Sequence, residues 1–241
     1  FQTCPVESPS YSLATLAPPV ATFNLPEKGC VESVIHFENT STFDPNAQVY
    51  YHWTNDNIGV TNIENPSHAY DLPGQYQVSL RVYYSDERCA ANISKTIDIG
   101  DIPVVQIGHD GQPEICEGEE LILTADGTFE SYAWNNGATG SSIAVTESGT
   151  YEVTVRNAHG CEGKSSLDVI VHPAPDIAIT PANPSITPGE ALQLTASGAT
   201  TYAWADVEGI EDLYISNPFV SPLNTTIYSV QGVDANNCTG S

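Results

Sequence analysis

A single aromatic phrase, Tyr-x-Trp, occurs three times in this chain of 241 residues and uses all three of its tryptophans. Each tryptophan is followed, after gaps of 23, 17 and 24 residues, by a tyrosine that opens an alternating segment. The pairs in chain order are Trp53 with Tyr76, Trp134 with Tyr151, and Trp204 with Tyr228. Self-similarity in a fixed order indicates tandem modules, each of which buries a small core of its own.

Two further alignments fix the repeat. Residues 116–125 align with residues 187–196 at an offset of 71, and Tyr151 and Cys161 match Tyr228 and Cys238 at an offset of 77. We predict that each tryptophan fills the middle of its module's core. Each tyrosine is predicted to form a corner, with its ring packed inside and its hydroxyl bonded to the backbone near the turn before its strand. A sugar-stacking platform is the alternative for the aromatics, but one aromatic per module at a fixed position favours the core.

The residue types and their spacing indicate an all-β fold. Thr, Ser, Val, Ile, Tyr, Asn, Gly and Pro are abundant, and these residues favour strands and turns. Period-2 alternation recurs at residues 76–82, 121–125 and 151–155, whereas no window of 11 residues keeps an apolar stripe at helical spacing. Short strands separated by turn residues predict β-sandwiches without crossover helices.

Pro-containing joints divide the chain. We expect the tail of a preceding module and a joint at 1–19, followed by β-sandwich modules at 20–100, 101–172 and 173–241. Proline restricts the backbone of short joints, so we predict an extended array of modules. The third module has no counterpart of residues 165–171, and the sequence has no Met. We therefore expect this module to lack an edge strand and the chain to be a piece of a longer protein.

The charge and the motifs exclude several functions. The formal net charge of −24 disfavours nucleic acid as a partner, because a phosphate surface would be repelled. No apolar run reaches the roughly 18–20 residues of a membrane span, so we expect no membrane insertion of this segment. The sequence has no Gly-x-Ser-x-Gly elbow, His-Glu-x-x-His or phosphate-binding glycine loop. We expect that the chain is not an enzyme and that His68 has a packing role.

The first module also carries a family resemblance. His36-Phe37, then Trp53, then the run from Asn65 to Val82 with Gly74 resemble a PKD (polycystic kidney disease) domain. The later modules, with Gly149-Thr-Tyr151 and Gly160-Cys161, resemble Ig-like or PKD-like repeats of long surface proteins of Bacteroidota. Such repeats occur in SprB-type gliding adhesins and in other cargo of the type IX secretion system. The resemblance implies a secreted protein that is extracellular or on the bacterial cell surface.

Cysteine placement predicts disulfide bonds. Cys30 and Cys89 flank the first module, and Cys116 and Cys161 flank the second, so we predict one disulfide within each module. Such bonds persist outside the cytosol, which agrees with export. With Pro188 taken to stand where the third module would have its first cysteine, Cys238 is left without a predicted partner, as is Cys4.

Calcium is the one cofactor that the sequence puts forward. Asp98 and Asp101 span the first joint, Asp110 follows in the next loop, and Asn55-Asp-Asn57 forms a candidate loop inside the first module. Hard oxygen ligands at such joints can bind Ca²⁺ and rigidify modular proteins. None of these positions follows the spacing of a known calcium loop.

Two functions fit these observations. The leading hypothesis is a structural or adhesive repeat segment of a large surface protein, which acts as a spacer and a surface-contact module in adhesion or gliding motility. Its partners would be the neighbouring repeats and a surface polysaccharide or other adhesion target. The alternative is a non-catalytic, glycan- or protein-binding accessory region of a secreted hydrolase, in which exposed aromatics such as Tyr83, Tyr84 and Tyr214 would stack on sugar.

Overall fold

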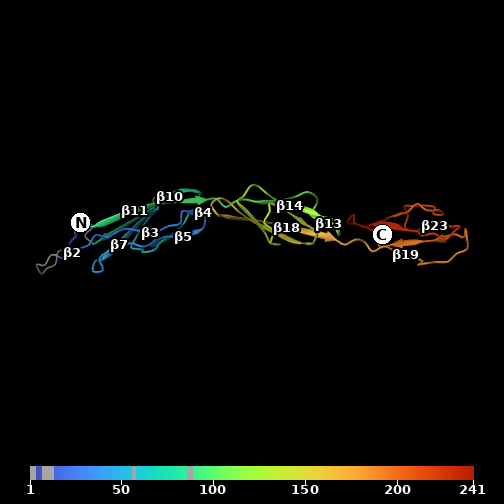
Figure 1. Ribbon diagram of the computed structural model, residues 1–241, viewed down its shortest axis with the longest axis horizontal. Coiled ribbons are helices and arrows are strands. Elements are labelled where there is room, and N and C mark those ends of the chain that lie inside the picture. The colour runs from blue at the N-terminus through green and yellow to red at the C-terminus, as the bar shows by residue number, and fades with distance from the viewer. Residues whose placement is uncertain (1–3, 7–13, 56–57, 86–88) are drawn as a thin grey trace. The chain divides into compact units, whose positions relative to one another are not determined.

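A computed structural model describes residues 4–6, 14–55, 58–85 and 89–241. Its regular structure in these residues is β-strand alone, so the chain is all-β (Figure 1). Within the described residues no helix is long and apolar enough to cross a membrane. The strands form several small sheets that pair face to face as β-sandwiches, and among the described strands no sheet mixes members of the three groups given below.

The first strands form a separate small sheet and then the first group. Strand β1 (Cys4–Val6) pairs with β2 (Ala14–Leu16) in a separate two-stranded sheet. The first group then comprises β3 (Phe23–Asn24), β4 (Lys28–Cys30), β5 (Val34–His36), β6 (Glu38–Asn39), β7 (Val49–Asn55), β8 (Ile58–Thr61), β9 (Ser67–Ala69), β10 (Gly74–Tyr84) and β11 (Ala90–Gly100). Its main sheet has the order β4-β11-β10-β7-β8, and β3-β6 and β5-β9 form the opposing pairs.

Alternation along β10 builds the core of this group. Val78, Leu80 and Val82 are fully buried, and the residues between them point away from the core. Trp53 on the neighbouring β7 is 1% exposed, and its ring lies 5.1 Å from the ring centroid of Phe23. The predicted alternating strand therefore supplies one wall of a core that is centred on the tryptophan.

The second group has two sheets. Its strands are β12 (Gln106–His109), β13 (Glu114–Cys116), β14 (Leu121–Asp126), β15 (Ser131–Trp134), β16 (Ser142–Val145), β17 (Gly149–Arg156) and β18 (Glu162–His172). One sheet has the order β12-β14-β16 and the other β13-β18-β17-β15. Leu121, Leu123 and Val153 are buried on alternate positions of their strands, as period 2 requires.

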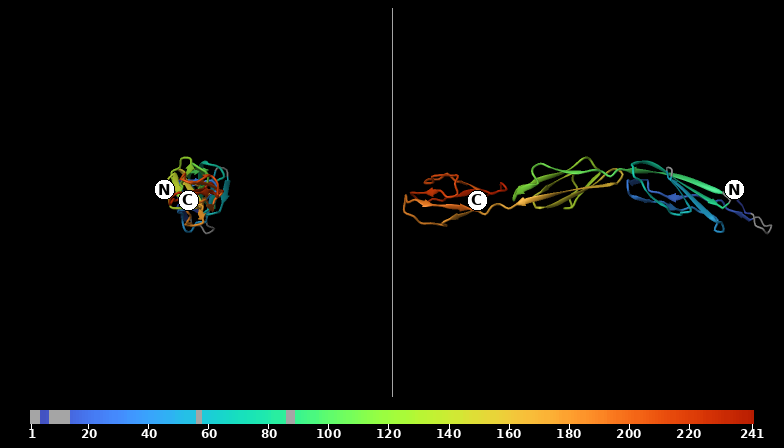
Figure 2. Two further views of the ribbon diagram at one scale, coloured as in Figure 1. Left: turned by 90° about the vertical axis from the view of Figure 1, so that its right-hand side faces the viewer. Right: turned by 180° about the vertical axis from the view of Figure 1, so that it is seen from behind.

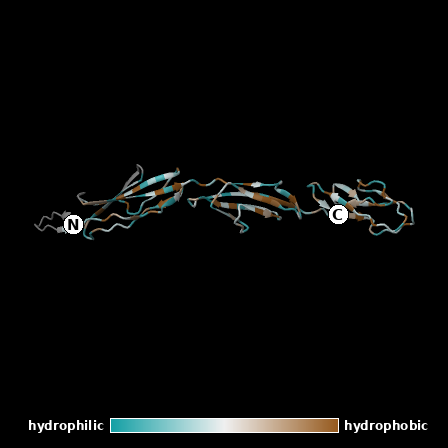
Figure 3. Ribbon diagram, turned by 45° about the horizontal axis from the view of Figure 1, so that its top comes forward, coloured by the Kyte–Doolittle hydropathy of each residue, from teal (hydrophilic) through white to brown (hydrophobic). Residues whose placement is uncertain are grey.

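The third group repeats this plan with shorter strands. They are β19 (Ala178–Thr180), β20 (Leu192–Gln193), β21 (Thr195–Ser197), β22 (Thr201–Trp204), β23 (Phe219–Val220), β24 (Val230–Val233) and β25 (Thr239–Gly240). The sheets are β19-β21, β20-β23 and β22-β24-β25. Along the ribbons of all three groups, hydrophobic residues gather on the strands while the turns are largely hydrophilic (Figure 3).

The three tryptophans share one hydrogen-bonding arrangement. Trp53, Trp134 and Trp204 are 1%, 4% and 4% exposed. Each indole Nε1 donates to a backbone carbonyl downstream, at Ile63, Gly140 and Ile215, with distances of 3.0, 2.9 and 2.8 Å. A buried indole needs such an acceptor, and the same solution in each group follows from the repeat.

Two of the tyrosines form the predicted corner, and the third does not. The hydroxyls of Tyr76 and Tyr151 donate to the carbonyls of Leu72 and Glu147, in the turns just before their strands. Tyr228 instead donates to Glu208, 20 residues upstream, because the segment before it forms neither the glycine turn nor the strand. Burial, and next the Glu208 carboxylate, raise the pKa of the Tyr228 hydroxyl.

Packing divides the chain into two compact units. The first consists of residues 1–104 together with 128–132 and 154–164, and the second of 105–127, 133–153 and 165–241. Residues 128–132 and 154–164, which include strand ends of the second group, thus pack with the first group. In the view from behind, the strands of each group again lie next to one another, as their colours show (Figure 2). Each unit contains one of the junctions described next.

Candidate functional site

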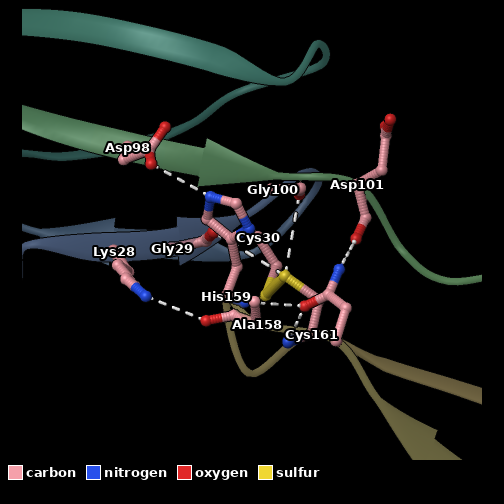
Figure 4. The surroundings of a disulfide bond; sticks show 10 residues. Lys28, Gly29, Cys30, Asp98, Gly100, Asp101, Ala158, His159 and Cys161 are labelled. Carbon is pink, nitrogen blue, oxygen red and sulfur yellow. Dashed lines mark hydrogen bonds and ion pairs between the residues drawn. A yellow bond between two sulfur atoms is a disulfide. The ribbon is translucent and has the colours of Figure 1, made fainter. Parts of the chain in front are cut away.

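A disulfide bond marks the junction inside the first unit. Cys30, the last residue of β4, is bonded to Cys161 in the turn between β17 and β18, across 131 residues of sequence (Figure 4). The Cα atoms of the two cysteines are 5.6 Å apart, within the usual range for a disulfide. The bond ties an early strand of the first group to a late turn of the second.

The second unit has the same arrangement. Cys116, the last residue of β13, is bonded to Cys238 in the turn between β24 and β25, across 122 residues. The Cα atoms are 5.4 Å apart. Each bond therefore connects the first cysteine of one group to the late-turn cysteine of the next group along the chain.

The predicted pairing within modules, Cys30 with Cys89 and Cys116 with Cys161, is wrong. Strand β4 runs parallel to the end of β11, where Cys30 is the partner of Gly100, while Cys89 lies just before the other end of that strand. Strand β11 has 11 residues, so its ends are about 35 Å apart at roughly 3.4 Å per residue. Disulfide formation needs Cα atoms within about 7 Å, which excludes the pair.

The second group excludes its predicted pair in the same way. Cys116 is the partner of His172 at the end of β18, and Cys161 precedes the start of that 11-residue strand. Cys238, for which the sequence analysis gave no partner, is bonded to Cys116. Cys89 is disulfide-bonded as well. The side chain of Cys4 lies outside the described part of the chain.

Hydrogen bonds surround the first disulfide. The Asn157 side-chain oxygen accepts from the backbone amides of His159 and Cys161, both at 3.0 Å, and so shapes the turn that carries the cysteine. Its Nδ2 donates to the carbonyl of Asp101 at 2.7 Å, and Lys28 Nζ donates to the carbonyl of Ala158 at 2.9 Å (Figure 4). These bonds join the turn to both strands that end at the junction.

A histidine and two glycines complete the contact. His159 Nε2 lies 3.0 Å from a carboxylate oxygen of Asp98, and its ring covers Gly100. A Cβ on Gly100 would lie 2.5 Å from His159 Cγ. A Cβ on Gly163 would lie 1.9 Å from the carbonyl oxygen of Pro103. The His159 side chain approaches Gly100, and the Pro103 backbone approaches Gly163, more closely than a Cβ at either position would allow.

The second junction reproduces these features at equivalent positions. The Asp234 carboxylate accepts from the amide of Cys238 at 2.8 Å, as Asn157 does for Cys161. A Cβ on Gly240 would lie 2.1 Å from the carbonyl oxygen of Pro175. The pattern Asn/Asp-x3-Cys-x-Gly therefore builds both junctions. The offset of 77 residues matches the Asn/Asp and the glycine as well as the tyrosine and the cysteine, so the sequence carried a signal for these junction residues that the prediction did not use.

Gly163 provides a direct test of this packing. We expect Gly163→Ala to destabilise the junction by about 1–3 kcal/mol, because the added methyl meets rigid backbone. Amide exchange at residues 157–161 should become faster, and the thermal unfolding midpoint should fall. Gly149→Ala is the matched control, since nothing lies within 4 Å of the place that its methyl would take and its change should be small. Equal effects of the two variants would contradict the packing account.

The structure corrects the position assigned to the missing cysteine. Thr187, and not Pro188, occupies the place of Cys116 in the third group. The amides of Glu119 and Glu190 donate to the carbonyls of Cys116 and Thr187 in the same type of turn, both at 3.0 Å. Hydrogen bonds from the Thr187 hydroxyl, and next from its amide, lower the pKa of Glu190. The third group thus has no cysteine at the position that forms a junction disulfide.

The candidate calcium ligands are used differently. The Asp98 carboxylate is within hydrogen-bond distance of His159 Nε2, at 3.0 Å. The Asp110 carboxylate accepts a hydrogen bond from the amide of Ile122, also at 3.0 Å. Within the described residues, no group of three or more His, Cys, Asp or Glu side chains is placed to hold a metal ion. The structure therefore does not assemble Asp98, Asp101 and Asp110 into a site. Residues 56 and 57 of the other predicted loop lie outside the described residues.

The candidate sugar-stacking tyrosines differ in their exposure. Tyr84 is buried, and its hydroxyl donates a hydrogen bond to the carbonyl of Ala17. The prediction that Tyr84 is exposed is therefore wrong. Tyr83 stacks on Tyr50 with ring centroids 5.7 Å apart. Tyr214 is 77% exposed. His68 packs edge-on against the Tyr70 ring, with ring centroids 4.8 Å apart.

Comparisons with known proteins match part of this chain to one family and to several solved structures. Residues 16–99 match the family described as "PKD domain". Similar solved structures include the PKD1 domain of the Vibrio cholerae metalloprotease PrtV, with 28% identity over 34% of this chain and 98% of that one, at a TM-score of 0.29. The PKD1 domain of Vibrio anguillarum Epp has 27% identity over 36% and 99%, at a TM-score of 0.30. Fibronectin(III)-like modules of Clostridium thermocellum CbhA have 14% identity over 64% and 95%, at a TM-score of 0.37.

Proposed function

We propose that this chain is a non-catalytic repeat segment of a secreted surface protein, in which disulfide-locked junctions make the modules act together as a spacer and a surface-contact element. The observation that carries the proposal is the repeated junction: Cys30–Cys161 and Cys116–Cys238 both connect successive strand groups. A spacer must transmit load from module to module, and a covalent bond at each junction serves that purpose.

Two findings support an extracellular setting. Disulfide bonds form and persist in oxidising compartments, and residues 16–99 match the PKD domain family. The formal net charge of −24 would keep neighbouring molecules apart on a crowded surface. On the sequence resemblance, we propose that the chain is one of the repeats of Bacteroidota surface proteins, with adhesion or SprB-type gliding motility as the setting.

The proposal is tested by retention and turnover assays on insoluble polysaccharides. We expect no turnover of glycan or peptide, and no retention that depends on an exposed aromatic ring. Tyr214→Ala is the informative variant, since this ring is 77% exposed, and Leu72→Ala, at a position 68% exposed, is the control without a ring. Saturable retention that Tyr214→Ala abolishes and Leu72→Ala preserves would make the chain a glycan-binding module instead. Turnover by the purified chain would overturn the non-catalytic proposal.

A further inference from the structure

The loop between β22 and β23 carries large apolar side chains that face solvent. Tyr214 is 77% exposed, Phe219 46% and Ile215 40%, and all three lie within a stretch of six residues. We call residues 205–219 the Tyr214 loop. Exposed apolar residues that occur singly need no explanation, but three in one short stretch are typical of a contact surface. Tyrosine is also among the residues that most often anchor protein interfaces.

Hydrogen bonds brace the Tyr214 loop against the core of the third group. The backbone amide of Trp204 donates to the carbonyl of Leu213, and its indole Nε1 donates to the carbonyl of Ile215, both at 2.8 Å. The amide of Ala196 donates to the carbonyl of Ser216 at 2.7 Å. The side chain of Leu213 packs on the core. A partner that binds this braced loop loses little free energy in ordering it.

The equivalent loop of the second group lacks these exposed side chains. Trp134 donates to a carbonyl six residues downstream, at Gly140, whereas the acceptor of Trp204 is 11 residues downstream, five residues more. Residues 135–141 of the second group include no charged residue and no large apolar residue. Because the shorter loop satisfies its tryptophan equally well, the core does not require the longer Tyr214 loop.

The charge of the Tyr214 loop indicates what kind of partner fits it. Four exposed carboxylates lie on the loop, at Asp206, Glu208, Glu211 and Asp212. The second compact unit, which contains the loop, has no Lys or Arg in its sequence. No lysine or arginine of its own unit therefore neutralises these carboxylates. The loop combines apolar side chains with a negative potential, and this combination is complementary to a basic, partly apolar surface.

The same charge disfavours other partners. A second copy of this chain has the same formal net charge of −24, so the two copies repel each other. Anionic lipids and nucleic acids carry phosphate groups and are repelled in the same way. A neutral glycan would stack on Tyr214 but would leave the carboxylates without a countercharge. A basic segment of another protein is the partner that uses both features of the loop.

We propose that the Tyr214 loop is a docking site for a basic segment of another protein, in which an apolar side chain lies between lysine or arginine residues. The apolar side chain packs on Tyr214 and Phe219, and the flanking cations pair with the loop carboxylates or lie over the Tyr214 ring. This goes beyond the spacer role, because it assigns the third group a partner of its own.

A labelled peptide of the sequence Gly-Lys-Leu-Lys-Gly-Lys-Leu-Lys-Gly tests the site on the full chain. We expect saturable binding by fluorescence anisotropy and slower amide exchange in residues 205–219. Raising the salt concentration from about 0.05 to about 0.5 M should weaken the binding about fivefold or more, because salt screens the charges. The same peptide with glutamate in place of lysine should not bind. Serine in place of leucine should weaken the binding about tenfold.

Two ring variants test the apolar part of the site. Tyr214→Ala should weaken the binding of the lysine peptide about tenfold or more, because it removes the exposed anchor. Tyr214→Phe should retain most of the affinity, since the ring remains. Leu223→Ala is the matched control, at a position 60% exposed outside the loop, and should leave the affinity unchanged.

Two charge variants test the electrostatic part. Asp206→Asn combined with Glu211→Gln should weaken the binding several-fold at low salt and have little effect at high salt. Glu117→Gln combined with Glu120→Gln removes the same charge from exposed positions of the second group and is the matched control. The control pair should leave the affinity nearly unchanged, because its charges lie outside the site.

Three results would overturn the proposal. The first is no binding of the lysine peptide at millimolar concentration, and the second is equal weakening by the loop variants and their controls. The third is protection of the loop by the neutral glycan cellohexaose and not by the peptide, which would make it a sugar site. The first two leave the proposed function standing, because that function rests on the junction disulfides, whereas the third would overturn both.

Discussion

Pulled between residues 27 and 241, the oxidised chain should extend far less than its length in residues allows. The two disulfides overlap in sequence, because Cys116 lies inside the loop closed by Cys30–Cys161. The shortest covalent path from Cys30 to Cys238 crosses the first bond, follows the 45 residues between Cys161 and Cys116, and crosses the second bond. After complete unfolding, the covalent path between the two outer cysteines should therefore be about 160 Å long at roughly 3.6 Å per residue.

Reduction should remove this limit. The 208 residues between Cys30 and Cys238 would then contribute about 750 Å, more than four times the oxidised value. Single-molecule force spectroscopy with and without a thiol reductant measures both lengths. Disulfides within modules would leave 104 residues free, or about 370 Å, so an oxidised contour near that length would contradict the observed connectivity.

Replacing Trp53 by alanine should cost about 3–5 kcal/mol in the free energy of unfolding. The side chain is 1% exposed and contacts the rings of Phe23 and Phe37, with centroids 5.1 and 5.8 Å away. Its removal leaves a cavity in a small core and deprives the Ile63 carbonyl of its donor. Denaturant unfolding monitored by circular dichroism, with hydrogen exchange over residues 20–100, should show the first group losing its stability.

Trp53→Phe is the matched control for this prediction. Phenylalanine retains most of the ring contacts and loses the indole hydrogen bond, so its cost should be markedly smaller than that of alanine. A glycan-binding role for Trp53 would predict a different result, in which alanine removes retention on polysaccharide and leaves stability nearly unchanged.

The all-β class and the buried tryptophans could be predicted because they depend on local patterns. Alternation in residues 76–82 places Val78, Leu80 and Val82 on one face, and the structure buries all three. The corner hydrogen bonds of Tyr76 and Tyr151 follow from turns four residues upstream. The hydrogen bond of Tyr228 could not be predicted, because its acceptor, the carbonyl of Glu208, is 20 residues away in sequence. Which carbonyl lies near the hydroxyl depends on how the whole third group folds.

The disulfide pairing could not be predicted, because it depends on strand direction and not on spacing. Cys30 and Cys89 flank the same group in sequence, but the parallel pairing of β4 with β11 places them near opposite ends of that strand. Local patterns give no direction for a strand of three residues such as β4. Cys238 has no other cysteine in its own group, which is compatible with a bond to another group but does not identify the partner.

Mapping of disulfide-linked peptides tests the central claim most directly. The chain should be digested without reduction, under conditions that prevent thiol exchange, and the cross-linked peptides identified by mass spectrometry. We predict one peptide pair that contains Cys30 with Cys161 and another that contains Cys116 with Cys238. Recovery of Cys30 with Cys89 and of Cys116 with Cys161, or of these cysteines as free thiols from secreted protein, would contradict the disulfide-locked junctions.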